Sequence, residues 1–212
     1  MSANSTTQLN LPNALTILRI LLVPVMAVVW FLHPHEVPWR IAVAVIFVVA
    51  SLTDLLDGYI ARKYDLITDF GALWDPIADK LLTGTAFVGL SLLGELPWWM
   101  TIVILVREWG ITAVRAAVKK YGVISANRGG KAKTLTQTLA LILFLLWLPE
   151  LPGPVQVIGW ALMWLAVILT VVTAVSYLTA AWRLWRSGKQ AEKSAASDEG
   201  PVADDSPAAT DD

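Results

Sequence analysis

Six long runs of apolar residues constrain the fold of this 212-residue chain more than any other feature of its sequence. As a helix, about 20 apolar residues span the hydrocarbon core of a bilayer, and each run reaches or approaches that length. Within hydrocarbon the backbone must satisfy its own hydrogen bonds, which a helix does. The sequence therefore predicts an all-α integral membrane protein with six transmembrane helices, over residues 14–32, 40–62, 70–94, 97–119, 132–148 and 155–182.

The two ends of the chain differ from this apolar body. Residues 8–13 have the character of a short interfacial lead-in, with Asn13 as the candidate N-cap of the first helix. From Ser187 onward the sequence lacks apolar periodicity and carries seven acidic residues against two lysines. We therefore predict three parts: an N-terminal interfacial segment (1–13), a six-helix membrane domain (14–186) and a disordered acidic tail (187–212).

Composition narrows the class of protein further. Hydrophobic residues make up 56% of the chain and charged residues 16%, against about 45–50% and about 25% in soluble domains. This apolar content excludes a fibrous or disordered protein. The absence of cysteine excludes a disulfide scaffold and any thiol-based redox or metal site. We expect membrane and small-molecule partners, and no nucleic acid.

Basic side chains gather at the joints that follow the second, fourth and sixth runs, whereas the opposite joints carry only Arg40. Loops rich in lysine and arginine stay on the cytoplasmic side. We therefore predict a multi-pass protein of the inner (plasma) membrane, with both termini and the active site facing the cytoplasm. Tryptophans at the opposite joints fit an interfacial belt: Trp30, Trp39, Trp98, Trp99 and Trp147.

Four aspartates lie inside the second and third runs, where a charged side chain costs roughly 2.5–3.5 kcal/mol and is usually functional. Asp54 and Asp57 are three residues apart, and Asp75 and Asp79 are four apart, so each pair shares one helix face. At 1.5 Å per residue, Asp54 lies about 12 Å from Arg62 and Asp79 lies about 14 Å from Phe70, at the cytoplasmic ends of the two runs. The spacing therefore brings four carboxylates to one level.

Four bare carboxylates in one cavity repel each other, and divalent cations relieve that repulsion. An all-oxygen set suits Mg²⁺ or Mn²⁺, which bind through carboxylates together with substrate phosphates. Two such ions can hold the attacking and leaving oxygens of a phosphoryl displacement. We therefore predict two Mg²⁺ (or Mn²⁺) ions per active site. The alternative is that the acids only pair with Arg62, Lys80 and Arg107.

Between the first and last of these acids the sequence reads Asp54-x2-Asp57-Gly58-x2-Ala61-Arg62-x8-Gly71-x3-Asp75-x3-Asp79. This pattern resembles the signature of the CDP-alcohol phosphotransferase family at every fixed position, and the resemblance extends over roughly residues 8–182. It implies a six-helix membrane enzyme, usually a homodimer. Such an enzyme transfers a phosphatidyl group from a CDP-linked lipid to an alcohol and releases CMP.

The resemblance also implies roles for individual residues. Metal ligands are expected at Asp54, Asp57, Asp75 and Asp79, with Asp79 as the catalytic base. The site for the donor, CDP-diacylglycerol, is expected to comprise Asn13, Ala14, Leu15, Thr16, Gly58, Ala61, Arg62 and Thr68.

Two further stretches, Val106-Arg107-Glu108 and Gly130-Lys131-Ala132-Lys133-Thr134, resemble the branch of the family whose acceptor is sn-glycerol 3-phosphate. An anionic acceptor needs basic partners, so we expect its phosphate to bind at Arg107, Arg115, Lys131 and Lys133. The alternative for the two lysines is that they only set the membrane topology.

Other functions remain open at this stage. Within the family, the acceptor could instead be phosphatidylglycerol, as in a cardiolipin synthase, or an inositol phosphate, as in a phosphatidylinositol phosphate synthase. From another class, intramembrane acids also suit a divalent-cation or proton-coupled transporter. A transporter needs access from both faces, whereas here every intramembrane charge is expected to be reached from the cytoplasmic side.

Overall fold

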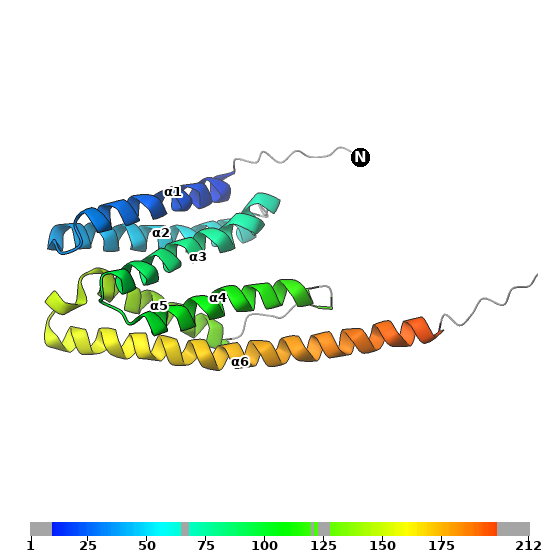
Figure 1. Ribbon diagram of the computed structural model, residues 1–212. Coiled ribbons are helices and arrows are strands. Elements are labelled where there is room, and N and C mark those ends of the chain that lie inside the picture. The colour runs from blue at the N-terminus through cyan, green and yellow to red at the C-terminus, as the bar shows by residue number, and fades with distance from the viewer. Residues whose placement is uncertain (1–9, 65–67, 120, 123–127, 199–212) are drawn as a thin grey trace, which may run out of the picture.

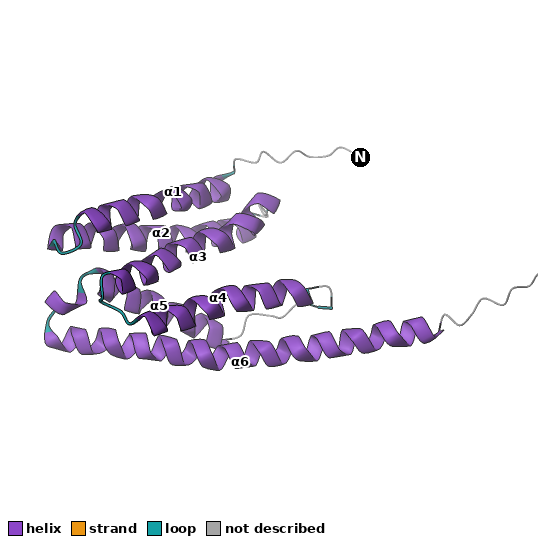
Figure 2. Cartoon of the chain, in the orientation of Figure 1, coloured by secondary structure: helices purple, strands orange, loops and turns teal. Residues whose placement is uncertain are grey.

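The computed structural model describes residues 10–64, 68–119, 121–122 and 128–198 (Figure 1). Its regular structure in these ranges is entirely helical (Figure 2), which confirms the predicted all-α class. The helices are α1 (Leu11–Leu32), α2 (Val37–Lys63), α3 (Asp69–Leu92), α4 (Trp98–Val118), α5 (Arg128–Leu145), a short 3₁₀ turn η1 (Leu148–Glu150) and α6 (Gly153–Asp198).

Three segments among the described residues are long and apolar enough to cross a membrane: Leu11–Leu32, Val37–Ala61 and Gly153–Gln190. Helices α3, α4 and α5 do not meet this criterion of length and composition. The same three helices carry several of the charged residues of the candidate site, among them Asp75, Arg107 and Lys133. Six spanning helices therefore remain a proposal.

Helix α1 begins earlier than predicted. Its N-cap is Asn10, whose side chain accepts a hydrogen bond of 3.0 Å from the backbone N–H of Asn13. Pro12 lies in the first turn, where its missing N–H costs the helix nothing. The assignment of Asn13 as the cap is thus wrong, and Asn13 is a buried residue within the helix.

Helix α6 continues beyond Ser187 and ends at Asp198, within the segment whose composition predicts disorder. Alanine, lysine, glutamine and glutamate, which recur in this stretch, are strong helix formers. The ring of Tyr121 also packs on α6, where a Cβ added to Gly188 would lie 2.1 Å from Tyr121 Cδ1. Residues 199–212 lie outside the described part of the chain, so the division into three parts remains a prediction.

The helices form an elongated bundle in which α1 packs on α2 and α3, while α6 runs along α4 and α5 (Figure 1). Large buried side chains fill the space between them, among them Phe47, Phe87, Phe144 and Met26. Trp30 belongs to this core and not to an interfacial belt, which corrects its predicted position. Its ring lies directly against α3, because a Cβ added to Gly89 would stand only 2.4 Å from the indole.

Arg40, predicted as the only basic residue of the outer joints, is fully buried. Its two terminal nitrogens contact the two carboxylate oxygens of Glu95 at 2.6 and 2.7 Å. Its N–H groups also donate to the backbone carbonyls of Pro34, Phe144 and Leu145. A guanidinium has five N–H donors, so these contacts satisfy the whole group and join α2, α5 and the connection between α3 and α4.

Candidate active site

The four aspartates of the predicted metal site lie where α1, α2 and α3 meet. Asp54 and Asp57 are near the C-terminal end of α2, and Asp75 and Asp79 are in the first half of α3. Asp54 interacts electrostatically with Asp57 and Asp75, and Asp79 interacts with Asp54. Two helices joined by a short connection thus bring the four acids into one cluster, named here the acid cluster.

Arg19 of α1 forms ion pairs with two acids of this cluster, Asp54 and Asp57. Its Nη2 donates to Asp57 Oδ2 at 2.5 Å, and its Nη1 lies 2.6 Å from Asp54 Oδ1 without the alignment of a hydrogen bond. Its Nε donates to the backbone carbonyl of Ala50 at 3.2 Å, and the side chain is 0% exposed. Sequence reasoning missed this role, although Arg19 is the only charged residue in the run 14–32 and that signal marks it.

The three cations proposed as alternative partners are placed differently. Within the described residues, Lys80 interacts electrostatically with Asp79 but makes no ion pair with it, and instead donates to the carbonyl of Pro76 at 3.2 Å and lies over the ring of Trp109. Arg107 pairs with Glu108 on its own helix. The side chain of Arg62 lies outside the described part of the structure.

One face of α1 contacts the site. It carries Asn13, Thr16 and Arg19, which are spaced three residues apart. Thr16 Oγ1 contacts Asp75 Oδ1, and Asn13 Oδ1 accepts a hydrogen bond of 2.9 Å from Thr68 Oγ1. Thr68 in turn caps α3, accepting from the N–H of Gly71 at 3.1 Å. These contacts fix the start of α3, and with it the position of the acids that follow.

The other residues expected at the donor site are less enclosed. Ala14 is exposed and Leu15 is half-buried on α1, and Gly58 and Ala61 are half-buried on α2. At Gly71 an added Cβ would stand 3.1 Å from Asn13 Oδ1 and 3.5 Å from Asp75 Oδ2. A larger residue at position 71 would therefore press on the side chains that surround the acids.

A second group of charges, the basic cluster, comprises Arg107, Glu108 and Lys133 from α4 and α5. Glu108 Oε1 accepts from Arg107 Nη1 at 2.9 Å and also from Lys133 Nζ. Helix α6 supplies two further partners of Arg107. The guanidinium donates to Thr173 Oγ1 at 2.9 Å and lies over the ring of Tyr177. Arg107 Nε is buried and has no hydrogen-bond partner within the described residues.

The two clusters are neighbours, because Asp79 interacts electrostatically with both Glu108 and Lys133. The structure thus places Arg107 and Lys133, two of the four residues predicted to bind an acceptor phosphate, close to the acids. The other two, Arg115 on α4 and Lys131 on α5, have exposed side chains. Glu108 was part of a quoted motif but received no predicted role, because the sequence does not show that two cations converge on it.

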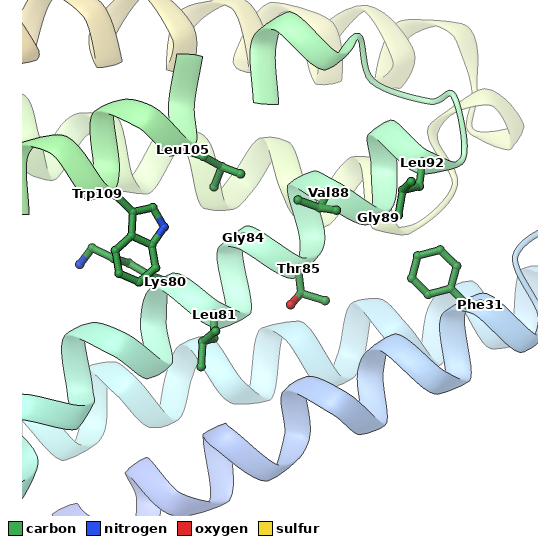
Figure 3. Close-up of a pocket in the computed structure, with 10 residues that line it drawn as sticks. All are labelled: Phe31, Lys80, Leu81, Gly84, Thr85, Val88, Gly89, Leu92, Leu105 and Trp109. Atoms are coloured by element: carbon green, nitrogen blue, oxygen red, sulfur yellow. The ribbon is translucent and has the colours of Figure 1, made fainter. Parts of the chain in front are cut away.

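An apolar groove of about 310 Å³ lies between α1, α3 and α4 (Figure 3). Lys80 and Trp109 stand at one end of it, and Phe31 and Leu92 stand at the other. None of the four acids lines it, and neither do Arg107 and Lys133. The groove therefore borders the acid cluster only through Lys80, which interacts electrostatically with Asp79.

Comparison with known proteins decides the family. A sequence profile described as CDP-alcohol phosphatidyltransferase matches residues 9–172. The chain belongs to this family. The prediction of a CDP-alcohol phosphotransferase made from the spacing of the acids is thereby confirmed.

Individual bacterial relatives of this family member agree. A probable phosphatidylglycerophosphate synthase of Mycobacterium tuberculosis (strain H37Rv) is 47% identical over 175 residues, covering 82% of each chain. A CDP-diacylglycerol–glycerol-3-phosphate 3-phosphatidyltransferase of Bacillus subtilis is 38% identical over 189 residues, covering 82% of this chain and 95% of its own. A protein of the same name from Shigella flexneri is 38% identical over 180 residues, with 82% and 96% covered. Together with the apolar helices, these relatives indicate a multi-pass membrane protein.

Members of the family generally use a divalent metal ion. The acid cluster fits a hard cation in its chemistry, because its acidic side chains offer only oxygen ligands. Within the described residues, no group of three acidic or histidine side chains has an arrangement that could hold an ion. The carboxylates point instead at α1, where Arg19 contacts Asp54 and Asp57 and Thr16 contacts Asp75.

Proposed function

We propose that this enzyme transfers the phosphatidyl group of CDP-diacylglycerol to sn-glycerol 3-phosphate and releases CMP. The relatives named for this reaction, up to 47% identical, support both substrates. The structural observation that carries the proposal is the electrostatic interaction of Asp79 with Glu108 and Lys133 of the basic cluster. An acid suited to activate a hydroxyl stands beside cations suited to bind a phosphate.

The acid cluster is the proposed reaction centre, with Asp54, Asp57, Asp75 and Asp79 as ligands of two Mg²⁺ (or Mn²⁺) ions. When bound, such ions neutralise the charge of the donor phosphates and of the CMP leaving group. The acceptor hydroxyl attacks the phosphorus that carries the diacylglycerol, and the bond from that phosphorus to CMP breaks. Asp79 accepts the hydroxyl proton, provided that the two oxygens come within about 2.6–3.2 Å.

The donor site is proposed beside the acids on α1 and α2. Gly58 and Ala61 have small side chains, which lets the cytidine approach the helix backbone. Arg62 would pair with the pyrophosphate, because a guanidinium binds phosphate through two parallel hydrogen bonds. Thr68 and the four residues 13–16 complete this proposed site.

The acceptor phosphate is proposed to bind at the basic cluster. Arg107 and Lys133 have side chains only 12% and 4% exposed, so water screens their charges weakly. Arg107 Nε supplies a buried donor for an incoming oxygen. Arg115 and Lys131, being exposed, would meet the anion first as it arrives from the cytoplasm.

We further propose that all six α-helices span the inner membrane, with the acid cluster facing the cytoplasm, and that the enzyme is a homodimer. Helices α3, α4 and α5, which fall short of the length and composition typical of a span, each carry charges of the two clusters. Those charges face one another inside the bundle, as Arg107, Glu108 and Lys133 do. Polar groups directed at protein are tolerated at membrane depth.

The deciding experiment measures CMP release by the purified protein in liposomes that contain CDP-diacylglycerol and Mg²⁺. We expect release with sn-glycerol 3-phosphate, and little with inositol phosphate, phosphatidylglycerol or no acceptor. Turnover with one of the other acceptors alone would assign the enzyme to another branch of the family. Cation flux into liposomes without donor lipid would instead support a transporter.

A further inference from the structure

We propose that Arg19 is a positioning residue for the metal ligands, which restrains the side chains of Asp54 and Asp57 before a divalent cation binds. The inference rests on the proposed function, because it assumes that the acid cluster binds such a cation. It concerns a residue outside the signature pattern, on a helix that contributes none of the four acids.

The geometry of Arg19 suits this role because each end of its guanidinium has a different partner. Nε donates to the carbonyl of Ala50, which fixes the direction in which the two terminal nitrogens point. Nη1 and Nη2 then each reach a separate carboxylate, Asp54 and Asp57. A planar group held at three points leaves little freedom of rotation to either acid.

The contacts use one oxygen of each carboxylate, Oδ1 of Asp54 and Oδ2 of Asp57. A carboxylate has two oxygens, so the contacts with Arg19 leave the other oxygen of each acid for a metal ion. Carboxylates that bind metal ions are themselves commonly hydrogen-bonded by neighbouring groups. Loss of such a neighbour typically weakens metal affinity or activity by about 10–100-fold.

Arg19 also offsets the repulsion between the two acids. Asp54 and Asp57 share one face of α2, and the Asp57 side chain is almost fully buried. Without a cation beside them, the two carboxylates would disfavour each other's charged form. Thr16, one turn earlier on α1, contacts Asp75 in a similar way, so this face of α1 orients acids of both α2 and α3.

The test measures Mn²⁺ binding to the purified protein in detergent, without substrates, by the loss of the free-ion electron paramagnetic resonance signal. We expect Arg19→Met to weaken Mn²⁺ binding by at least about tenfold. Arg19→Lys keeps the charge but cannot reach both acids as a fork, so its affinity should fall between that of the wild type and that of Arg19→Met. The matched control is Arg183→Met, an exposed arginine of α6 that should leave the affinity unchanged.

Two further measurements distinguish the positioning of metal ligands from a merely structural role of Arg19. Each variant is compared at a temperature where its circular dichroism and its elution in gel filtration match those of the wild type. In the assay, the Mg²⁺ concentration for half-maximal rate should rise by a similar factor, while KM for sn-glycerol 3-phosphate stays within about twofold. A rise in both constants alike would contradict a role confined to the metal ligands.

The outcomes distinguish this inference from the proposed function. If the wild type binds no Mn²⁺, the proposed metal site fails. If the wild type binds and folded Arg19→Met binds equally well, the positioning role is overturned and the proposed metal site stands. Should Arg19→Met not fold, Arg19→Lys decides, because wild-type affinity in that variant would show that the fork is not needed.

Discussion

Arg40 and Glu95 form a buried, bidentate ion pair at the end of the bundle opposite the acid cluster, with nitrogen–oxygen distances of 2.6 and 2.7 Å. Along α2, Arg40 lies about 21 Å from Asp54 at 1.5 Å per residue. The pair therefore has no place in the proposed chemistry. Its effect is to hold three parts of the bundle together, since Arg40 also binds backbone carbonyls of α5 and of the turn before α2.

Removing the charge of Glu95 should destabilise the protein. In Glu95→Gln the buried guanidinium loses its counter-charge, a change that typically costs about 3–5 kcal/mol. We expect a clearly lower midpoint in thermal unfolding followed by circular dichroism in detergent. Glu36→Gln is the control, because Glu36 is exposed and its ion pair is with the nearby His33. Equal midpoints for the two variants would show that the Arg40 pair does not stabilise the fold.

A larger residue at position 89 should also destabilise the fold. The cause here is a steric clash in the core and not the loss of an ion pair. The new Cβ of Gly89→Ala would stand 2.4 Å from the Trp30 ring, which is fully buried and cannot move freely. Overpacking of this kind costs about 1–3 kcal/mol. Gly84→Ala on the same helix provides the comparison, since its Cβ would have its nearest neighbour at 3.7 Å. Thermal unfolding should separate the two variants, with only Gly89→Ala melting earlier.

Replacing a single acid of the acid cluster should abolish activity. We expect Asp75→Asn to lose nearly all CMP release and to bind Mn²⁺ more weakly, because one charged ligand is gone. Asp79→Asn should lose kcat while retaining CDP-diacylglycerol binding, as the loss of a base does. Glu150→Gln, an exposed acid of η1, is the control. Near-normal turnover in Asp75→Asn or Asp79→Asn would remove that residue from the site.

Substitutions in the basic cluster should weaken binding of the acceptor and leave binding of the donor unchanged. A charge-assisted hydrogen bond is worth about 1.5–3 kcal/mol, or roughly 10–150-fold in affinity. We therefore expect Arg107→Ala and Lys133→Ala to raise KM for sn-glycerol 3-phosphate at least about tenfold, with little change in KM for CDP-diacylglycerol. Lys189→Ala, on the exposed part of α6, should change neither constant. A rise in KM for the donor alone would move these residues to the nucleotide site.

The sequence locates the four acids well because a charge inside an apolar run stands out against its neighbours. The same rule applies to Arg19, yet its partner could not be assigned. The pairing depends on how α1 is rotated against α2, and a run of apolar residues on all sides does not fix that rotation. Glu108 was missed for a related reason, since its two cations come from α4 and α5.

Position along a helix is likewise easier to predict than the direction of a side chain. Trp30 and Trp39 both lie near the same joint, but Trp39 is exposed and Trp30 is buried against Gly89. For Arg40, only a position at an outer joint was predicted from the sequence. The burial of Arg40 requires Glu95, which is 55 residues away in sequence. The residues around Arg40 in the sequence therefore do not reveal this partner.

Helix α6 runs without interruption for 46 residues, about 69 Å at 1.5 Å per residue. Within this one rod, Thr173 and Tyr177 contact Arg107, and Gly188, about 22 Å further along, receives the ring of Tyr121. One continuous helix thus carries both contacts, so the placement of Thr173 beside Arg107 depends on the same element that packs against Tyr121.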